Sequence, residues 1–277
     1  MNKLILSTGC LFHKPLGDTF LLAKKAGFDG IEVMVDNNPE SLDTRKLNGF
    51  AEKFNIPVLS LHMPLDKCAV FGDDPQEIIN SMVGIAQKLI VKNIVVHPAR
   101  KTSSSYYNKL IDAINSKNNE TTNAVYSSNG SEKLPTRNGI VFAVENLPDN
   151  GKYNKKVQNP VGLSQDFQDI CLDTSHLATT SLDFKEVVSE AKNNIRHVHF
   201  SDSDILKKDG IVTDDHLPLV HGKLPLKWLV QLLINTGYKG MFCFELRPEL
   251  FSGLSSTQIT DLLKDIRSKY LSYNNKF

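Results

Sequence analysis

Histidine and acidic residues recur at the ends of short apolar segments along this chain, as in LSLHMP, IVVHP and FAVEN. In chain order these residues are His62, His97, Glu145, Asp173, His176, His199 and Glu245. Two further residues of these types, Asp214 and His216, lie in the long loop that follows the HVHFSD segment. Imidazole nitrogens and carboxylate oxygens are ligands of Zn²⁺ and Mn²⁺. Enclosed together, such groups would repel and desolvate one another unless a cation joined them. The pattern therefore predicts a site for a divalent cation, Zn²⁺ or Mn²⁺, or for a small cluster of such ions.

The individual spacings are weak signals, and it is their coincidence that indicates a site. Asp173-x-x-His176 and Asp214-x-His216 are common spacings. A lone histidine in an apolar segment is more often a hydrogen-bonded core residue than a ligand. We expect His197 to be such a core residue, because it shares strand parity with His199 but lies one layer deeper in the barrel.

The elements that must position these residues follow from the hydrophobic pattern, because short apolar runs alternate with helical spacing, as in βαβ units. We expect strands at Leu4–Cys10, Gly30–Val35, Val58–Met63, Asn93–His97, Ile140–Asn146, Ile170–Thr174, Arg196–Ser201 and Met241–Leu246. We expect helices at Thr19–Ala26, Leu42–Phe54, Pro75–Leu89, Ser105–Asn115, Leu163–Phe167, Phe184–Asn193, Pro225–Thr236 and Thr257–Tyr270. This order predicts an α/β fold, a single-domain (β/α)8 TIM barrel over residues 1–277, with a doubly wound open sheet as the alternative.

Strand alternation tests whether the carboxylates would point into such a barrel, where the carboxyl ends of all strands meet at one mouth. Glu145 shares parity with Ala143, whereas Phe142 would face the helices. Glu245 likewise shares parity with Cys243. Small residues inward and bulky residues outward favour carboxylates that point into the mouth.

Composition restricts the class of protein. The hydrophobic share is 40% and the net charge is +1, which argues against a broadly basic nucleic-acid surface. The four cysteines (Cys10, Cys68, Cys171 and Cys243) form no CxxC pair, which favours reduced thiols. The apolar run at residues 4–6 is too short for a signal peptide, and no stretch approaches the roughly 20 apolar residues of a membrane span. We expect a soluble, cytoplasmic protein that does not engage membranes and that can form oligomers.

Two further groups of residues carry expectations. The segment 117–139 is rich in Asn, Ser and Thr, and we expect a mobile loop there, on the amino-terminal face of the barrel. Around the mouth, Glu32, Lys223 and Arg247 are candidates for binding substrate, although surface salt bridges are an equal reading for the two cationic residues.

From GFDGIEV to FCFELRPE the chain resembles the xylose-isomerase-like barrels, which include sugar and sugar-phosphate isomerases and epimerases and the endonuclease IV-type apurinic endonucleases. The resemblance is carried by LSLHMP, IVVHP, VENLP, LDTSHL, HVHFSDS, DDHLPLVHGKLP and FELRP. These motifs are specific for the superfamily and less so for one reaction.

The epimerase members imply a metal held by Glu145, Asp173, His199 and Glu245. The two glutamates would also be the catalytic acid and base, and His176 would contact a substrate hydroxyl. The resemblance thus implies a metal-dependent isomerase or epimerase of a carbohydrate or sugar phosphate.

The endonuclease members imply the alternative, a phosphoesterase with three zinc ions and nine ligands, all of whose positions are filled here. DNA would be the partner only in that case. Against it, MPLDKCAVFGDDP lacks an apolar wedge for DNA, IVVHPARK lacks a glycine-rich continuation, and the net charge is nearly neutral. A metal-dependent binding protein without catalysis is a third class.

Overall fold

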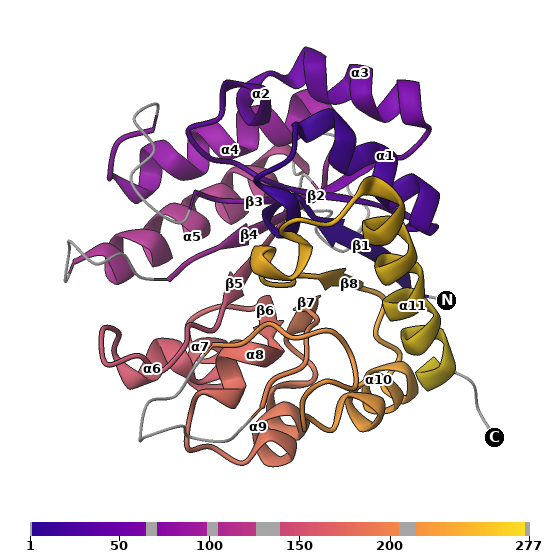
Figure 1. The fold of residues 1–277 in the computed structure, drawn as a ribbon. Coiled ribbons are helices and arrows are strands. Elements are labelled where there is room, and N and C mark those ends of the chain that lie inside the picture. Colours follow the sequence, from indigo (N-terminus) through magenta and orange to yellow (C-terminus); the bar gives the residue numbers. More distant parts are fainter. Residues whose placement is uncertain (1, 65–70, 99–104, 126–138, 205–213, 275–277) are drawn as a thin grey trace.

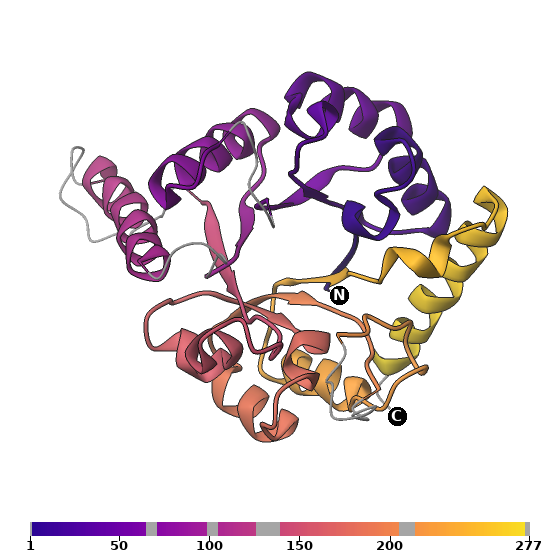
Figure 2. The same ribbon diagram turned by 60° about the vertical axis from the view of Figure 1, so that its left-hand side comes forward.

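The computed structural model describes residues 2–64, 71–98, 105–125, 139–204 and 214–274. Its strands form one closed, all-parallel barrel in the order β1 to β8 (Figures 1 and 2). The strands are β1 Lys3–Ser7, β2 Gly30–Met34, β3 Val58–His62, β4 Asn93–Val96, β5 Val141–Glu145, β6 Ile170–Asp173, β7 Ile195–His199 and β8 Met241–Phe244. This confirms the predicted (β/α)8 TIM barrel and excludes the open sheet.

The helices surround the barrel (Figure 2). They are α1 Leu16–Ala26, α2 Pro39–Leu42, α3 Thr44–Phe54, α4 Pro75–Leu89, α5 Tyr106–Val125, α6 Lys155–Gln158, α7 Pro160–Ser164, α8 Thr174–Ala178, α9 Phe184–Ala191, α10 Leu226–Asn235 and α11 Ser256–Asn274, with the 3-10 helices η1 Thr8–Leu11 and η2 Pro248–Phe251. Their starts follow from local chemistry. The Asp74 side chain accepts a hydrogen bond from the Gln76 N–H, with Pro75 at the first position of α4.

Side chains that alternate along the strands divide the interior into two layers. Phe142 and Val144 belong to the layer between strands and helices. Val95, Ala143 and Cys171 form a separate small cluster inside the barrel. Small inward residues leave room at the barrel axis for polar side chains, as strand parity predicted.

One expectation about the chain connections is wrong. Segment 117–139 was expected to be a loop, but residues 117–125 continue α5. The stretch 126–138 lies outside the described residues. The helix continues because Asn, Ser and Thr each cost less than about 1 kcal/mol in a helix, and residues 117–125 contain no glycine or proline.

Two other sequence expectations concern cysteines and membranes. Cys10, Cys171 and Cys243 are buried free thiols, and Cys68 lies outside the described residues. Burial raises the pKa of the Cys10 thiol to about 12. Among the described helices, none combines the length and apolar character needed to cross a bilayer.

The C-terminal caps of α4 and α3 give a test of backbone strain. Ile90 caps α4 at φ 58° and is 83% exposed, whereas Asn55 caps α3 at φ 50°. A β-branched residue is strained in this left-handed region, and asparagine tolerates it. We expect Ile90→Asn to raise the free energy of unfolding by about 1 kcal/mol, measured by urea denaturation. The matched Asn55→Ile variant should lower it by a similar amount, and a loss of stability in Ile90→Asn would contradict the strain.

Candidate metal centre

The strands deliver most of the expected site residues to the carboxyl-terminal mouth of the barrel. Four are the last residues of their strands, and two directly follow a strand. In barrel order they are His62 (β3), His97 (after β4), Glu145 (β5), Asp173 (β6), His199 (β7) and Glu245 (after β8). Because six of the eight strands end at or directly before a ligand-type residue, closing the barrel brings the six together.

The centre of the site is the Nδ1 atom of His199. It lies 2.6 Å from Glu145 Oε1, 2.7 Å from Glu245 Oε2 and 3.6 Å from Asp173 Oδ2. All four side chains are buried or nearly so, the most exposed being Glu245 at 16%. Three carboxylates packed this closely need a positive charge between them.

The protonation of this group follows from its charges. Burial alone would raise the pKa of Glu145, but His199 and His97 hold it well below its ordinary value. Burial also opposes the shift at Glu245, whose pKa is nevertheless lowered by His199. Both glutamates are therefore anionic at neutral pH, as ligands and proton acceptors must be.

A second group lies beside the first and shares Glu145. His97 Nε2 is 2.7 Å from Glu145 Oε2, and His62 Nε2 is 3.4 Å from the same oxygen. The Nδ1 of His62 is 2.7 Å from the Met63 carbonyl oxygen and so donates its proton there. This leaves Nε2 of His62 as the nitrogen that can bind a cation.

A third group forms on the outer side of the mouth, around Asp214. Its two carboxylate oxygens lie 3.1 Å from His176 Nε2 and 3.0 Å from His216 Nε2. The Nδ1 atoms of these histidines face the carbonyl oxygens of Asn146 and Glu245, at 2.8 and 3.0 Å. As at His62, the backbone fixes Nδ1 as donor and turns Nε2 inward.

Unpaired atoms show whether these residues fit a metal ion. Among the described residues, His97 Nε2, Glu145 Oε2 and Asp173 Oδ2 are buried without a hydrogen-bond partner. Each such atom costs about 1–3 kcal/mol, so their gathering at one place needs compensation. Divalent cations bound among these groups would supply the missing partners, and the N/O donor set suits Zn²⁺ or Mn²⁺.

The structure places the expected substrate-binding residues differently. Glu32 is fully buried, and its carboxylate faces His197 and His199. This position does not favour the expected contact between Glu32 and substrate. Lys223 Nζ lies 3.0 Å from Asp204 Oδ1, and the Lys223 side chain is 56% exposed. Lys223 therefore forms the surface salt bridge that the sequence allowed as the alternative to substrate binding. Arg247 is exposed at the start of η2, beside the site.

Two buried polar residues, His197 and Asn146, lie next to the site residues. His197 is fully buried and contacts Asn93, which confirms its expected core role. Asn146 was not singled out, although it joins the ends of β5 and β6. Its side chain accepts from the Asp173 N–H at 2.8 Å and donates to the Asp173 carbonyl oxygen at 3.0 Å. The available signal was a polar residue directly after Glu145 in VENLP.

Known proteins resemble this chain over most of its length. The family model described as xylose isomerase-like TIM barrel matches residues 20–264. An uncharacterized protein of Mycobacterium leprae (strain TN) is 24% identical over 296 aligned residues, covering 97% of this chain and 98% of that protein.

Solved structures of three kinds share the fold. IolI, described with a binding zinc atom, has a TM-score of 0.68 at 20% identity, covering 99% of this chain and 100% of that chain. D-allulose 3-epimerase from Methylomonas sp., in complex with D-allulose, has a TM-score of 0.67 at 14% identity, with coverages of 98% and 97%. AP endonuclease, family 2, from Brucella melitensis has a TM-score of 0.64 at 18% identity, with coverages of 93% and 96%. At these identities the likeness establishes the barrel alone.

The metal fit predicts a thermal response. We expect saturating Zn²⁺ or Mn²⁺ to raise the melting temperature, because a ligand at 100 times its Kd adds about 2.7 kcal/mol to the stability of the folded state. Asp173→Asn should remove most of that rise while retaining the side-chain oxygen that caps α8. The matched control is Asp166→Asn, which changes a carboxylate paired with Lys156 on the surface. Equal metal-induced rises in both variants would exclude Asp173 as a ligand.

Proposed function

The chain belongs to the xylose isomerase-like TIM barrel family, and from this we propose that it is a divalent-metal-dependent isomerase or epimerase of a sugar or sugar phosphate. The observation that carries the proposal is the convergence of Glu145, Asp173 and Glu245 on His199 Nδ1. The likeness to an epimerase that binds D-allulose and to IolI with zinc supports it.

In this proposal Glu145, Asp173, His199 and Glu245 hold the metal. The bound cation would polarise substrate oxygens and so acidify the carbon-bound proton beside a carbonyl group. Its ligands come from β5, β6, β7 and the end of β8, which are rigid elements of a closed barrel. The site therefore needs no rearrangement of strands to accept the ion.

Glu145 and Glu245 are the acid–base pair of this proposal. Both are anionic, so one can accept the proton from carbon while the other, after taking a proton from solvent, returns it to carbon, and the first then releases its proton to solvent. They approach His199 from strands on either side of β6 and β7, which allows removal and return from different faces of the substrate.

Polar groups around this pair would bind the hydroxyls of the substrate. His176 lies at the mouth with its Nε2 atom turned inward, and we assign it a contact with a substrate hydroxyl. Arg247 is exposed next to Glu245 and suits a phosphate group or a hydroxyl. Lys223 is a weaker candidate, because Asp204 already neutralises it.

A second candidate is a zinc-dependent phosphoesterase of the endonuclease IV type. It is favoured by the two outer groups, His62 with His97 and His176 with Asp214 and His216, which surround the central ligands as a trinuclear site requires. The shared fold of the Brucella melitensis endonuclease agrees with it. The net charge of +1 gives it little support, because broad phosphate binding needs excess positive charge.

Metal stoichiometry separates the two candidates. The isomerase predicts one tightly bound, exchangeable ion per chain after dialysis, measured by plasma mass spectrometry, whereas the phosphoesterase predicts three zinc ions. We expect one ion. We also expect His97→Asn to retain it, because His97 pairs with His62 in the second group and is not one of the four central ligands. Three ions in the wild-type protein, reduced in His97→Asn, would favour the phosphoesterase.

Isotope exchange tests the acid–base pair. In D₂O the metal-loaded protein should place deuterium on the carbon beside the carbonyl of a ketose such as D-allulose or its phosphate, as seen by NMR. Because general acid–base catalysis contributes about 10²–10⁴-fold, Glu145→Gln and Glu245→Gln should each reduce the rate by at least that range.

The control for this experiment is Glu186→Gln, which removes a carboxylate from the first turn of α9 and should exchange deuterium at the wild-type rate. Circular dichroism should show that all three variants keep the barrel. Wild-type exchange in Glu145→Gln or Glu245→Gln would reject the assigned roles.

A further inference from the structure

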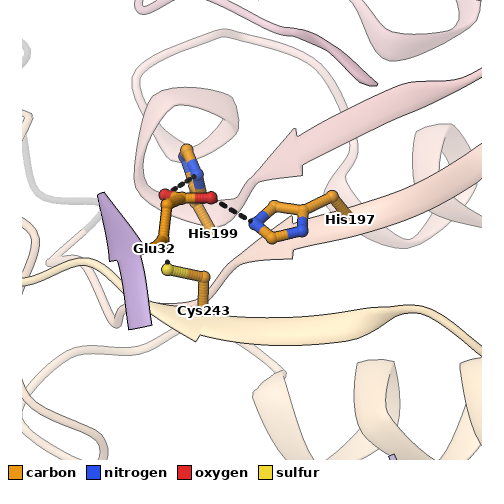
Figure 3. A group of neighbouring side chains, drawn as sticks. All are labelled: Glu32, His197, His199 and Cys243. Carbon is orange, nitrogen blue, oxygen red and sulfur yellow. Dashed lines mark hydrogen bonds and ion pairs between the residues drawn. The ribbon is translucent and has the colours of Figure 1, made fainter. Parts of the chain in front are cut away.

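Beneath the candidate metal centre, the carboxylate of Glu32 is enclosed inside the barrel (Figure 3). Its Oε1 atom lies 3.0 Å from His199 Nε2 and accepts from Cys243 Sγ at 3.4 Å. Its Oε2 atom lies 3.0 Å from His197 Nε2 and accepts from Ser60 Oγ at 2.6 Å. Burying a carboxylate costs several kcal/mol unless hydrogen bonds compensate, and here both oxygens are surrounded by donors.

The direction of these hydrogen bonds is fixed by Asn93 at the start of β4. An amide nitrogen can only donate. Asn93 Nδ2 lies 3.2 Å from His197 Nδ1, so that ring nitrogen is the acceptor and the proton of His197 is on Nε2, facing Glu32. Asn93 Nδ2 also donates to Ser60 Oγ at 2.9 Å, which directs the Ser60 hydroxyl proton to Glu32.

The contact with Glu32 also determines which nitrogen of His199 keeps its proton. Glu32 Oε1 can only accept, so the nitrogen of His199 that faces it carries a proton. The other nitrogen, Nδ1, faces the carboxylates of Glu145 and Glu245, which likewise can only accept, so it shares a proton with them in the absence of a metal ion. It is the nitrogen that can release this proton and present a lone pair to a bound cation.

We propose that Glu32 is a positioning residue that holds His199 in the Nε2–H tautomer, so that Nδ1 is presented to the metal. The role in metal binding rests on the proposed function. Histidine ligands are commonly oriented by a carboxylate on their second nitrogen, which also makes the ligand atom more basic. Here the Glu32 carboxylate on β2 accepts a hydrogen bond from Ser60 on β3 and lies 3.0 Å from Nε2 of His197 on β7. Three strands of the barrel therefore fix its position.

Glu32, His197, His199 and Cys243 also lie close enough together to suggest a metal site of their own. The hydrogen-bond directions argue against it, because the Nε2 atoms of both histidines already carry protons that face Glu32. A positioning role uses the contacts as they stand, whereas a metal in this group would require them to break.

Metal affinity is the first test, measured by competition with a chromophoric chelator for Zn²⁺ and Mn²⁺. Loss of such a carboxylate costs about 10–100-fold in metal affinity, so we expect Glu32→Gln to weaken binding by that range. The control is Ser60→Ala, which removes a donor to Glu32 but leaves its contact with His199, and should bind metal near the wild-type affinity. Unchanged affinity in Glu32→Gln would overturn the proposal.

The second test reports on the imidazole directly and needs no variant that might fail to fold. Long-range proton–nitrogen NMR spectra of the ¹⁵N-histidine-labelled wild-type protein should show His199 protonated at Nε2, with and without metal. An Nε2 atom of His199 without a proton would overturn the proposal. If the wild-type protein bound no divalent metal, the proposed function would fail, and this spectrum would still decide whether the His199 nitrogen that faces Glu32 carries a proton.

Discussion

The constraint on which this structure depends is the repulsion among three buried carboxylates that face one imidazole nitrogen, His199 Nδ1. Two like charges about 4 Å apart interact by about 4 kcal/mol at the effective dielectric near a protein surface, and burial increases that cost. Such an arrangement persists only when a positive charge is shared among the carboxylates. The barrel holds the groups close despite this repulsion, because each comes from a different strand of a closed hydrogen-bonded sheet.

The closed sheet can hold these charges because its apolar packing lies elsewhere. Phe200, Phe242 and Phe244 pack against Tyr270 of α11 on the outer side of the strands, with ring centroids 5.0–6.2 Å from that of Tyr270. The interior is lined by small residues and polar groups. Stability therefore comes from the layer between strands and helices, and the axis is free for chemistry.

Strand ends and strand parity were readable from the sequence, but the depth of Glu32 within the barrel was not. Because six of the eight strands end at or directly before a ligand-type residue, the mouth could be predicted from segments such as LSLHMP, FAVEN and FCFEL. Glu32 was expected at the mouth, whereas it lies deeper in the barrel, because its layer depends on register, which shifts between Ile31 and Glu32 where β2 meets β3. The helical extension of α5 was missed for another reason, since polar composition alone does not end a helix.

The two candidate chemistries use the same side chains, so what separates them is whether the outer imidazoles hold metal or substrate. His62 and His176 each donate Nδ1–H to a backbone carbonyl oxygen, so Nε2 is the atom that each ring turns to the mouth, where it presents a lone pair when the imidazole is neutral. Such a nitrogen can ligate zinc, or it can accept a hydrogen bond from a sugar hydroxyl. Residue identity is the same in both cases, and the number of bound cations is therefore the property that distinguishes the reactions.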